Sequence, residues 1–199
     1  MAQQQQQQPY ETASSASSSR NGSGFETRGG GLHQQRAASW TKRNSLLCTS
    51  AIVTKTSDLK MFDGICAGPT FVFEGEDLEV EFLEYQVRIL KGNSCMIGLA
   101  PADKIQEYAG ADVYQKLGWY LHQSDGSLWC QGRPGGGDAY TNCAIEENSI
   151  VGVRLYRDEK RVSFTVDGED QGIAFSELWD GPFKLTVLLC RENNSVELL

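Results

Sequence analysis

The chain has 199 residues, and its 18 Lys and Arg against 26 Asp and Glu give a formal net charge of −8. This length fits one domain with a hydrophobic core of ordinary size. No run approaches the roughly 18 apolar residues of a membrane-spanning helix, and the N-terminus lacks the apolar core of a secretory signal. We therefore expect an intracellular, cytoplasmic protein that makes no contact with membranes.

Residues 1–45 are a low-complexity segment with eight Gln, eight Ser and five Gly. Such a segment buries too little apolar surface to offset its ordering entropy. We therefore predict a flexible tail over residues 1–45 and a folded domain over residues 46–199. The six glutamines Gln3–Gln8 stand where an expression tag or a natural polyglutamine tract would stand, and they receive no functional assignment.

Charge divides at the same boundary. The tail carries five cations and two anions, or +3, whereas the domain carries 13 cations and 24 anions, or −11. A domain with this charge repels a phosphate backbone, so nucleic acid is not an expected partner of the domain. The basic tail, which includes the RGG-like sequence Arg28–Gly31, keeps RNA contact as a weak alternative.

From Leu46 onward the sequence has the periodicity of strands. Leu78–Phe82 alternates apolar with acidic side chains, as expected for a strand with one buried and one solvated face. Dipeptides that favour tight turns separate the apolar runs, among them Asp125-Gly126 and Asp167-Gly168. Strands are predicted at 46–48, 51–53, 71–73, 78–82, 87–90, 96–99, 119–121, 127–130, 150–155, 162–166 and 185–190.

Helical signal is confined to Pro101–Tyr108 and Ser176–Leu178. A parallel α/β fold would lack its crossover helices, which excludes Rossmann and P-loop enzymes. The prediction is an all-β fold: a two-sheet antiparallel sandwich of jelly-roll type with one or two short helices. The six cysteines, scattered through a full-sized core, are expected to be reduced thiols.

Four motifs occur in an order that resembles the SPRY (B30.2) domain family. They are Met96-Ile97-Gly98-Leu99, Leu117-Gly118-Trp119-Tyr120, Asn148-Ser149-Ile150-Val151-Gly152, and Phe164-Thr165-Val166-Asp167-Gly168 leading to Gly172–Phe175. The chain departs from the family pattern at Asn148-Ser149 (Gly-Asp in the family) and at Asp167-Gly168 (Asn-Gly in the family), and both replacements still suit turns. The resemblance covers residues from about 60 to the C-terminus. It implies a bent, concanavalin-like β-sandwich that binds proteins.

The motif residues are interpreted as scaffold. Glycine inside or beside a strand permits a bulge or the close approach of another backbone. Large aromatic side chains fill the space of roughly 10 Å between two packed sheets. The scaffold set is Gly98, Gly118, Trp119, Gly152, Phe164, Gly168 and Phe175.

A glycosidase needs two carboxylates about 5–10 Å apart. Glu79 and Glu81 point to one side of the predicted strand 78–82, and Glu84 follows them. Solvated surface is the simpler interpretation of these acidic side chains, since no second acidic strand opposes them. A carbohydrate-binding or glycosidase-like sandwich is kept as the alternative function.

Nucleophilic catalysis would depend on His122, the only histidine in the domain, with Cys130 or Cys143 as its partner. A polar residue in a hairpin is the simpler interpretation of His122. No pair of cysteines or histidines has the spacing of a zinc site. We therefore predict no catalytic residue, no metal and no cofactor.

Recognition through loops remains, because interaction sites on rigid β-scaffolds usually lie in loops. The glycine-rich loop 131–140 offers Arg133, Asp138 and Tyr140, and arginine and tyrosine are enriched at interaction hot spots. The long connection 100–116 offers Tyr108 and Tyr114, and Trp179 lies in a third connection. We predict a non-catalytic adaptor module that binds a peptide or partner surface through these six residues.

Overall fold

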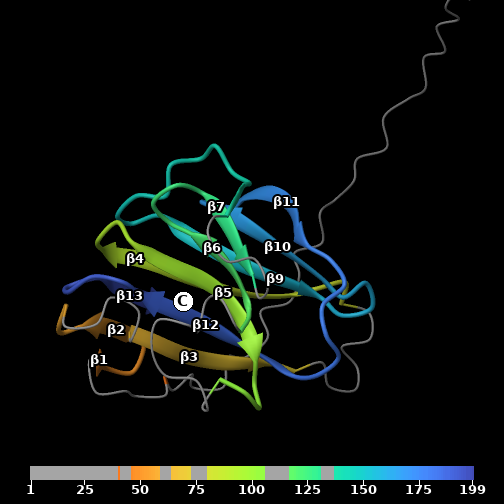
Figure 1. Cartoon of the computed structure of the whole chain (residues 1–199), viewed down its shortest axis with the longest axis horizontal. Helices are drawn as coiled ribbons and strands as arrows, with labels where there is room; N and C mark the ends of the chain where they lie inside the picture. The colour runs from red at the N-terminus through yellow and green to blue at the C-terminus, as the bar shows by residue number, and fades with distance from the viewer. Residues whose placement is uncertain (1–39, 41–45, 59–63, 73–79, 106–116, 131–136) are drawn as a thin grey trace, which may run out of the picture. The chain divides into compact units, whose positions relative to one another are not determined.

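The computed structural model describes residues 40, 46–58, 64–72, 80–105, 117–130 and 137–199 (Figure 1). All of them belong to one compact unit, Gln35–Leu199. The strands are β1 (Leu46–Cys48), β2 (Ile52–Lys55), β3 (Gly64–Phe71), β4 (Leu83–Lys91), β5 (Cys95–Pro101), β6 (Trp119–His122), β7 (Ser127–Cys130), β8 (Asp138–Ala139), β9 (Ile150–Tyr156), β10 (Arg161–Val166), β11 (Glu169–Phe175), β12 (Phe183–Leu189) and β13 (Ser195–Leu198).

The strands form two antiparallel sheets, which confirms the predicted all-β fold. Sheet A has the order β1-β2-β13-β4-β9-β10-β11, and sheet B has the order β3-β12-β5-β6-β7-β8 (Figure 1). Within sheet A, β13 lies between β2 and β4, so a strand from the last residues of the chain joins the first hairpin to the rest of the sheet. Within the described parts of the chain, no helix is long and apolar enough to span a membrane.

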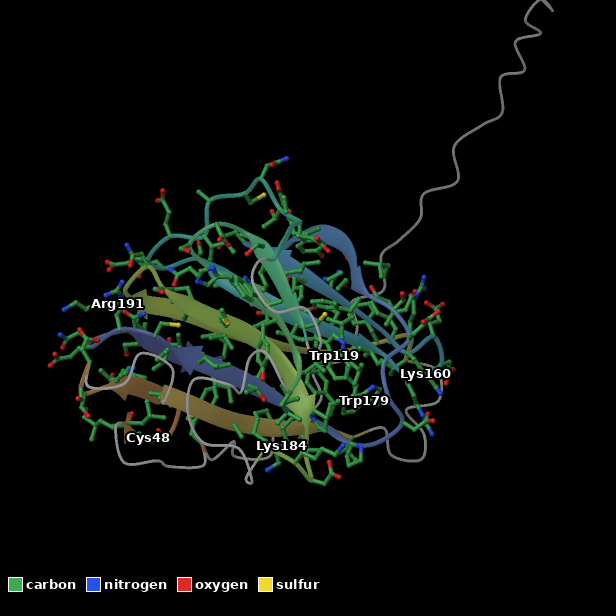
Figure 2. The ribbon with its side chains drawn as sticks, in the orientation of Figure 1. Cys48, Trp119, Lys160, Trp179, Lys184 and Arg191 are labelled. Carbon is green, nitrogen blue, oxygen red and sulfur yellow. The ribbon has the colours of Figure 1, made fainter. Side chains whose placement is uncertain are left out.

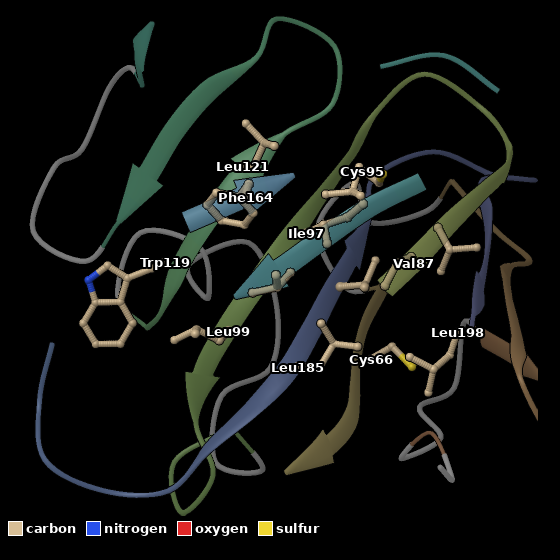
Figure 3. Close-up of a cluster of buried hydrophobic side chains, with 14 of the residues drawn as sticks. Cys66, Val87, Cys95, Ile97, Leu99, Trp119, Leu121, Phe164, Leu185 and Leu198 are labelled. Atoms are coloured by element: carbon tan, nitrogen blue, oxygen red, sulfur yellow. The ribbon is translucent and has the colours of Figure 1, made fainter. Parts of the chain in front are cut away.

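The core lies between the inward faces of the two sheets (Figure 3). Alternation places Val151, Val153 and Leu155 of β9 inward, and Arg154 outward. Phe164 of β10 is fully buried and stacks edge-to-face on Phe175, with ring centroids 6.4 Å apart. Sheet B supplies the facing apolar residues of this core, among them Ile97, Leu99, Leu121, Leu185, Val187 and Leu189.

The glycines of the scaffold set occupy positions with different constraints. A side-chain carbon at Gly98 in β5 would collide with the backbone of Trp119 and Tyr120 in β6. The three atoms nearest to a side-chain carbon at Gly152 would belong to the side chains of Thr165 and Glu84. Gly168 lies in the β10–β11 hairpin at φ +88° with open space around it, so backbone conformation is its constraint.

Gly118 combines both constraints. It precedes β6 at φ +101°, and a side-chain carbon there would lie 2.5 Å from the Leu99 carbonyl oxygen. Positive φ disfavours other residues, and the close approach of β5 leaves no room for one. Gly118 therefore fixes the entry of the chain into β6, where Trp119 begins the strand.

Several predicted elements differ from the structure. Residues 102–105 form a turn, and residues 176–178 are irregular, so the expected short helices are absent from the described residues of these segments. The strand predicted at 78–82 is not a strand over its described part, Val80–Phe82, because β4 begins only at Leu83. The structure adds Trp40, from the predicted tail, to the core: its indole N–H donates to the Ala51 carbonyl at 3.0 Å.

Candidate functional site

Antiparallel pairing brings several strand ends to one end of the sandwich. Leu83 at the start of β4 pairs with Leu155 near the end of β9, and Tyr156 pairs with Arg161 at the start of β10. Phe183 at the start of β12 pairs with both Phe71 of β3 and Pro101 of β5. We call this the Trp179 end, because the β11–β12 connection that reaches it carries Trp179 (Figure 2).

A pocket of about 390 Å³ opens at the Trp179 end. The β9–β10 turn and the β11–β12 connection border it, and the Leu178 N–H donates to the Lys160 carbonyl at 3.0 Å, which joins these two segments. This volume lies at the small end of the range for ligand sites, roughly 300–1,000 Å³. The lining is Phe71, Leu155, Tyr156, Arg157, Asp158, Lys160, Leu178, Trp179, Asp180, Gly181 and Phe183.

The pocket has an apolar floor. Phe71, Leu155, Leu178 and Phe183 are each no more than 5% exposed, so they belong to the core as well as to the pocket. Trp179 differs because it is 40% exposed. An exposed indole beside a pocket with an apolar floor provides a large contact area with little side-chain entropy to lose.

The indole of Trp179 is held by its neighbours. It stacks edge-to-face on Trp119, with centroids 5.6 Å apart and an interplanar angle of 83°, and Trp119 stacks similarly on Phe183 at 5.7 Å. The ammonium of Lys104 lies 4.6 Å from the centroid of the Trp179 ring. Figure 2 shows Trp119, Trp179 and Lys160 together at this end, away from Arg191. Trp179 is therefore both part of the core packing and accessible to a partner.

Charged side chains form the rim of the pocket. Lys160 pairs with Asp180 at 2.6 Å, and both side chains are exposed. Arg157 and Asp158 follow each other on the exposed β9–β10 turn. The four charged lining residues therefore sum to zero, and an exposed pair such as Lys160–Asp180 is weak enough to open for a ligand.

The structure describes only some of the six predicted binding residues. Trp179 lines the pocket. Tyr108, Tyr114 and Arg133 lie outside the described residues. Asp138 is exposed in the two-residue strand β8, which pairs with Ser127 and Leu128 of β7.

Tyr140 is anchored in the sandwich. Its hydroxyl donates to the Gly172 carbonyl at 2.6 Å and accepts from the Phe164 N–H at 3.3 Å, and its ring stacks on Phe164. Burial raises the pKa of the Tyr140 hydroxyl to about 12, and the negative charge of Asp170 adds to this rise, although the Phe164 hydrogen bond opposes it. Tyr140 thereby connects the chain after β8 to the edge strand β11.

His122 lies at the opposite end of β6 from Trp119, the residue with which Cys130 pairs, and the Cys143 thiol donates to Gln171. The Nδ1 atom of His122 lies 3.0 Å from Asp125 Oδ1, and Ser124 Oγ is nearly equidistant from both ring nitrogens, at 3.3 and 3.4 Å. An in-line Ser–His–Asp relay would instead place serine and carboxylate on opposite nitrogens. The group therefore forms a polar hairpin, in which Ser127 also donates to Asp125. Among the described residues, no group of His, Cys, Asp and Glu has the arrangement of a metal site.

Two of the three acidic residues considered for glycoside hydrolysis, Glu81 and Glu84, lie among the described residues. Glu79 lies outside the described residues, and Glu81 is exposed before the start of β4. Glu84 on β4 accepts from the Arg154 guanidinium at 2.7 Å, and Arg154 also pairs with Asp170 at 2.6 Å. The carboxylate of Glu84 is thus part of an ion-pair network on the outer face of sheet A.

Sequence reasoning missed Lys104, Arg157, Lys160 and Asp180. The segment Arg157–Lys160 has only the polar composition of an ordinary turn, and the pairing of β9 with β10 places it beside Trp179. Lys104 reaches Trp179 because the Ala102 N–H donates to the Pro182 carbonyl, which joins the chain after β5 to the chain before β12. The sequence signal that could have found these residues is the position of each of their segments next to strands that pair with one another.

A family model for the SPRY domain matches residues 82–199. The SPRY domain of human HERC1 is similar in structure, with a TM-score of 0.58 and 14% identity, covering 81% of this chain and 93% of that chain. A human SPRY domain (TM-score 0.57, 14% identity, coverage 80% and 96%) and the TRIM65 PSpry domain (0.58, 13%, 82% and 92%) are also similar. No curated protein sequence matches the chain.

Proposed function

Because this chain belongs to the SPRY domain family, as the order of its four motifs predicted, we propose that it binds a peptide or partner-protein surface at the Trp179 end. SPRY domains are generally non-catalytic modules used in protein–protein interaction. The binding mode proposed for this chain is a side chain of the partner in the pocket, with the rim charges contacting the partner backbone or its neighbouring side chains.

One observation carries the proposal: a tryptophan that is 40% exposed beside a pocket with an apolar floor. Interface energy concentrates in a few aromatic and arginine residues that are buried on binding, and a rim of weaker contacts excludes water around them. Trp179 fits the first role, and the rim of Arg157, Asp158, Lys160 and Asp180 fits the second. The packing against Trp119 supports the proposal further, because a pre-positioned ring loses less entropy on binding.

Quantitative affinity capture tests the site. The wild-type chain and the variants Trp179→Ala and Trp179→Phe serve as baits in an extract of the native cell, and captured proteins are quantified by mass spectrometry. Truncating a hot-spot tryptophan costs 2 kcal/mol or more, or about 30-fold in affinity. We expect Trp179→Ala to lose the specific partner and Trp179→Phe to retain part of it.

Ile173→Ala is the matched control. Ile173 is 44% exposed, close to the exposure of Trp179, but it lies on the edge strand β11 and does not line the pocket. Circular dichroism and thermal unfolding establish that each bait is folded. Retention of every partner by a folded Trp179→Ala variant would place the binding site elsewhere on the domain.

A further inference from the structure

We infer that the Trp179 pocket receives a basic side chain, arginine or lysine, from the partner protein. The inference rests on the proposed function, since it assigns a chemistry to the partner of the same pocket. The incoming cation takes the place that Lys104 occupies in the unbound chain. Four features support this: the contacts of the aromatic rings, the pairing of the rim charges, the charge of the domain, and the shape of the floor.

The face of Trp179 already holds a cation. The Lys104 ammonium lies 4.6 Å from the ring centroid, well within the roughly 6 Å range of a cation–π contact, and tryptophan is the strongest partner for such contacts. The Trp119 ring meets Trp179 edge-to-face, so the stack leaves part of the indole accessible, in agreement with its 40% exposure. Lys104 is thus an internal ligand that a partner cation can replace.

A second aromatic residue of the lining also holds a cation. The guanidinium of Arg161 lies 5.7 Å from the centroid of Tyr156. Tyr156 in turn stacks on Phe82 at 5.3 Å, and the Arg154 guanidinium lies 4.7 Å from the Phe82 centroid. Three aromatic rings at or beside this pocket therefore have basic side chains on them. A negative ring face attracts cations and repels carboxylates, so these rings favour a basic ligand.

The cations of the rim do not exclude such a ligand. Lys160 is paired with Asp180 at 2.6 Å, and Arg161 is paired with Glu159. Arg157 is followed directly by Asp158 on the same turn. Because each of these basic residues has an acidic neighbour, the local repulsion on an incoming arginine is small. The electrostatic field of the whole domain then determines whether a basic ligand is attracted.

That wider field is negative. Residues 46–199 carry 13 cations and 24 anions, a net charge of −11. Such a field raises the association rate of basic partners and disfavours acidic ones.

The floor of the pocket suits the stem of a long basic side chain. Phe71, Leu155 and Phe183 present apolar surface below the charged rim. Lysine and arginine place their hydrocarbon stems along apolar surface and keep the charged group in water. The stem would pack on these residues while the charged group reaches the indole of Trp179 and the carboxylates of the rim.

The test uses a displayed library of random peptides selected on the full chain, with the Trp179→Leu variant as counter-selection. We expect the peptides that depend on Trp179 to be enriched in arginine and lysine. Replacing the enriched arginine by citrulline, which has nearly the same shape and no charge, should weaken a selected peptide by about fivefold or more. Selected peptides dominated by carboxylates or by aliphatic side chains, or unaffected by citrulline, would overturn the inference.

Lys104→Gln provides a second and independent measurement. Removal of the internal cation should tighten binding of the arginine peptide about two- to fivefold, the equivalent of one exposed cation–π contact. Lys184→Gln is the matched control: it removes the same charge from β12 at the same end, where no contact with an aromatic ring is seen among the described residues. Equal effects of the two variants, or weaker binding to Lys104→Gln, would refute the exchange of cations.

Failure of the inference can be distinguished from failure of the proposed function. Peptides or partners that depend on Trp179 but not on basic residues would leave the site in place and reject the basic ligand. Peptides that bind Trp179→Leu as well as the wild-type chain, or a library that yields no peptide dependent on Trp179, would reject the site itself.

Discussion

Replacement of Gly98 by alanine tests the closest approach between two backbones in sheet B. Gly98 in β5 pairs with Tyr120 in β6. A β-carbon on Gly98 would lie 2.9 Å from the Trp119 carbonyl carbon and the Tyr120 Cα atom, and closer still to the Trp119 carbonyl oxygen. Real β-carbons keep at least 3.0 Å from such atoms, so the structure must shift.

The cost follows from which atoms must move. All three obstructing atoms belong to the backbone of β6, which is hydrogen-bonded to β5 on one side and β7 on the other. Overpacking costs about 1–3 kcal/mol where side chains can adjust, and more where they cannot. We therefore expect Gly98→Ala to cost about 3 kcal/mol or more of unfolding free energy. For a chain of this size that corresponds to a fall in melting temperature of about 6–12 °C.

Two other glycine variants separate the steric cause from the conformational one. Gly168→Ala places its new carbon in open space at φ +88°, so it should cost only the roughly 1–2 kcal/mol of a left-handed residue. Gly152→Ala meets the side chains of Thr165 and Glu84, which can move, so its cost should fall below that of Gly98→Ala.

Urea denaturation followed by tryptophan fluorescence measures all three variants. The urea concentration at the unfolding midpoint should decrease most for Gly98→Ala and less for Gly152→Ala and Gly168→Ala. The slope of the unfolding free energy against urea concentration should stay unchanged. If Gly98→Ala proved no more costly than Gly168→Ala, the two strands would have freedom to separate, and the close approach of β5 and β6 would not be a structural requirement.

Three further predictions concern titration, an ion pair and the thiols. The free energy of unfolding should decrease as the pH rises from about 10, where tyrosine titrates in the unfolded chain, to about 12, the raised pKa of Tyr140. The variant Tyr140→Phe should show a smaller decrease. Arg154→Met should destabilise the chain more than Arg154→Met combined with Glu84→Gln, because the single variant leaves a carboxylate that is only 17% exposed without its guanidinium. A thiol reagent should modify the native chain fastest at the three partly buried cysteines, since burial raises the pKa of Cys66, Cys95 and Cys190. The fast group is Cys48, Cys130 and Cys143.

Each of these predictions has a measurement that can contradict it. For Tyr140, equal alkaline losses in the wild-type chain and in Tyr140→Phe during urea titrations would assign the loss to other groups. For the ion pair, a double-mutant cycle with no coupling energy would show that Arg154 and Glu84 act independently. For the thiols, modification of the chain unfolded in urea should count all six cysteines. Six equally fast reactions in the native chain would contradict the observed burial.

The sequence predicted strands well where apolar residues recur at every second position. The runs 150–155 and 162–166 have this pattern and predicted β9 and β10, although the structure buries most positions of both strands. The prediction failed for β3, whose sequence contains Gly68 and Pro69 and resembles a loop. The structure shows why these residues are tolerated: β3 is an edge strand, and its register with β12 shifts where they occur.

Alternation alone also produced an error at 78–82. Alternating apolar and acidic residues satisfy a strand pattern, but a strand also needs a neighbour with which to pair. Val80 is 38% exposed and Glu81 is exposed, and pairing with β9 starts only at Leu83. Phe82, directly before β4, instead stacks on Tyr156 at the outer face of sheet A.

The site was predictable only in part. Residue type and connection position singled out Trp179, and the structure places it at the pocket. The residues around it are distant in sequence, and Lys104 in particular depends on the pairing of β12 with β5. Tyr140 is a residue type common at interaction hot spots, but its hydroxyl donates to the Gly172 carbonyl within the sandwich. No local sequence pattern reveals this contact.

The position of β13 between β2 and β4 has a consequence for how the chain reaches its native state. Synthesis delivers the β1–β2 hairpin first, but that hairpin has no neighbour in sheet A until residues 195–198 have been made. Until then, β2 and β4 each present an unpaired edge, which is the kind of surface that leads to association between chains. Proteolytic or genetic loss of these four residues would leave the same two edges exposed in the finished protein, so aggregation, and not only lower stability, is the expected result.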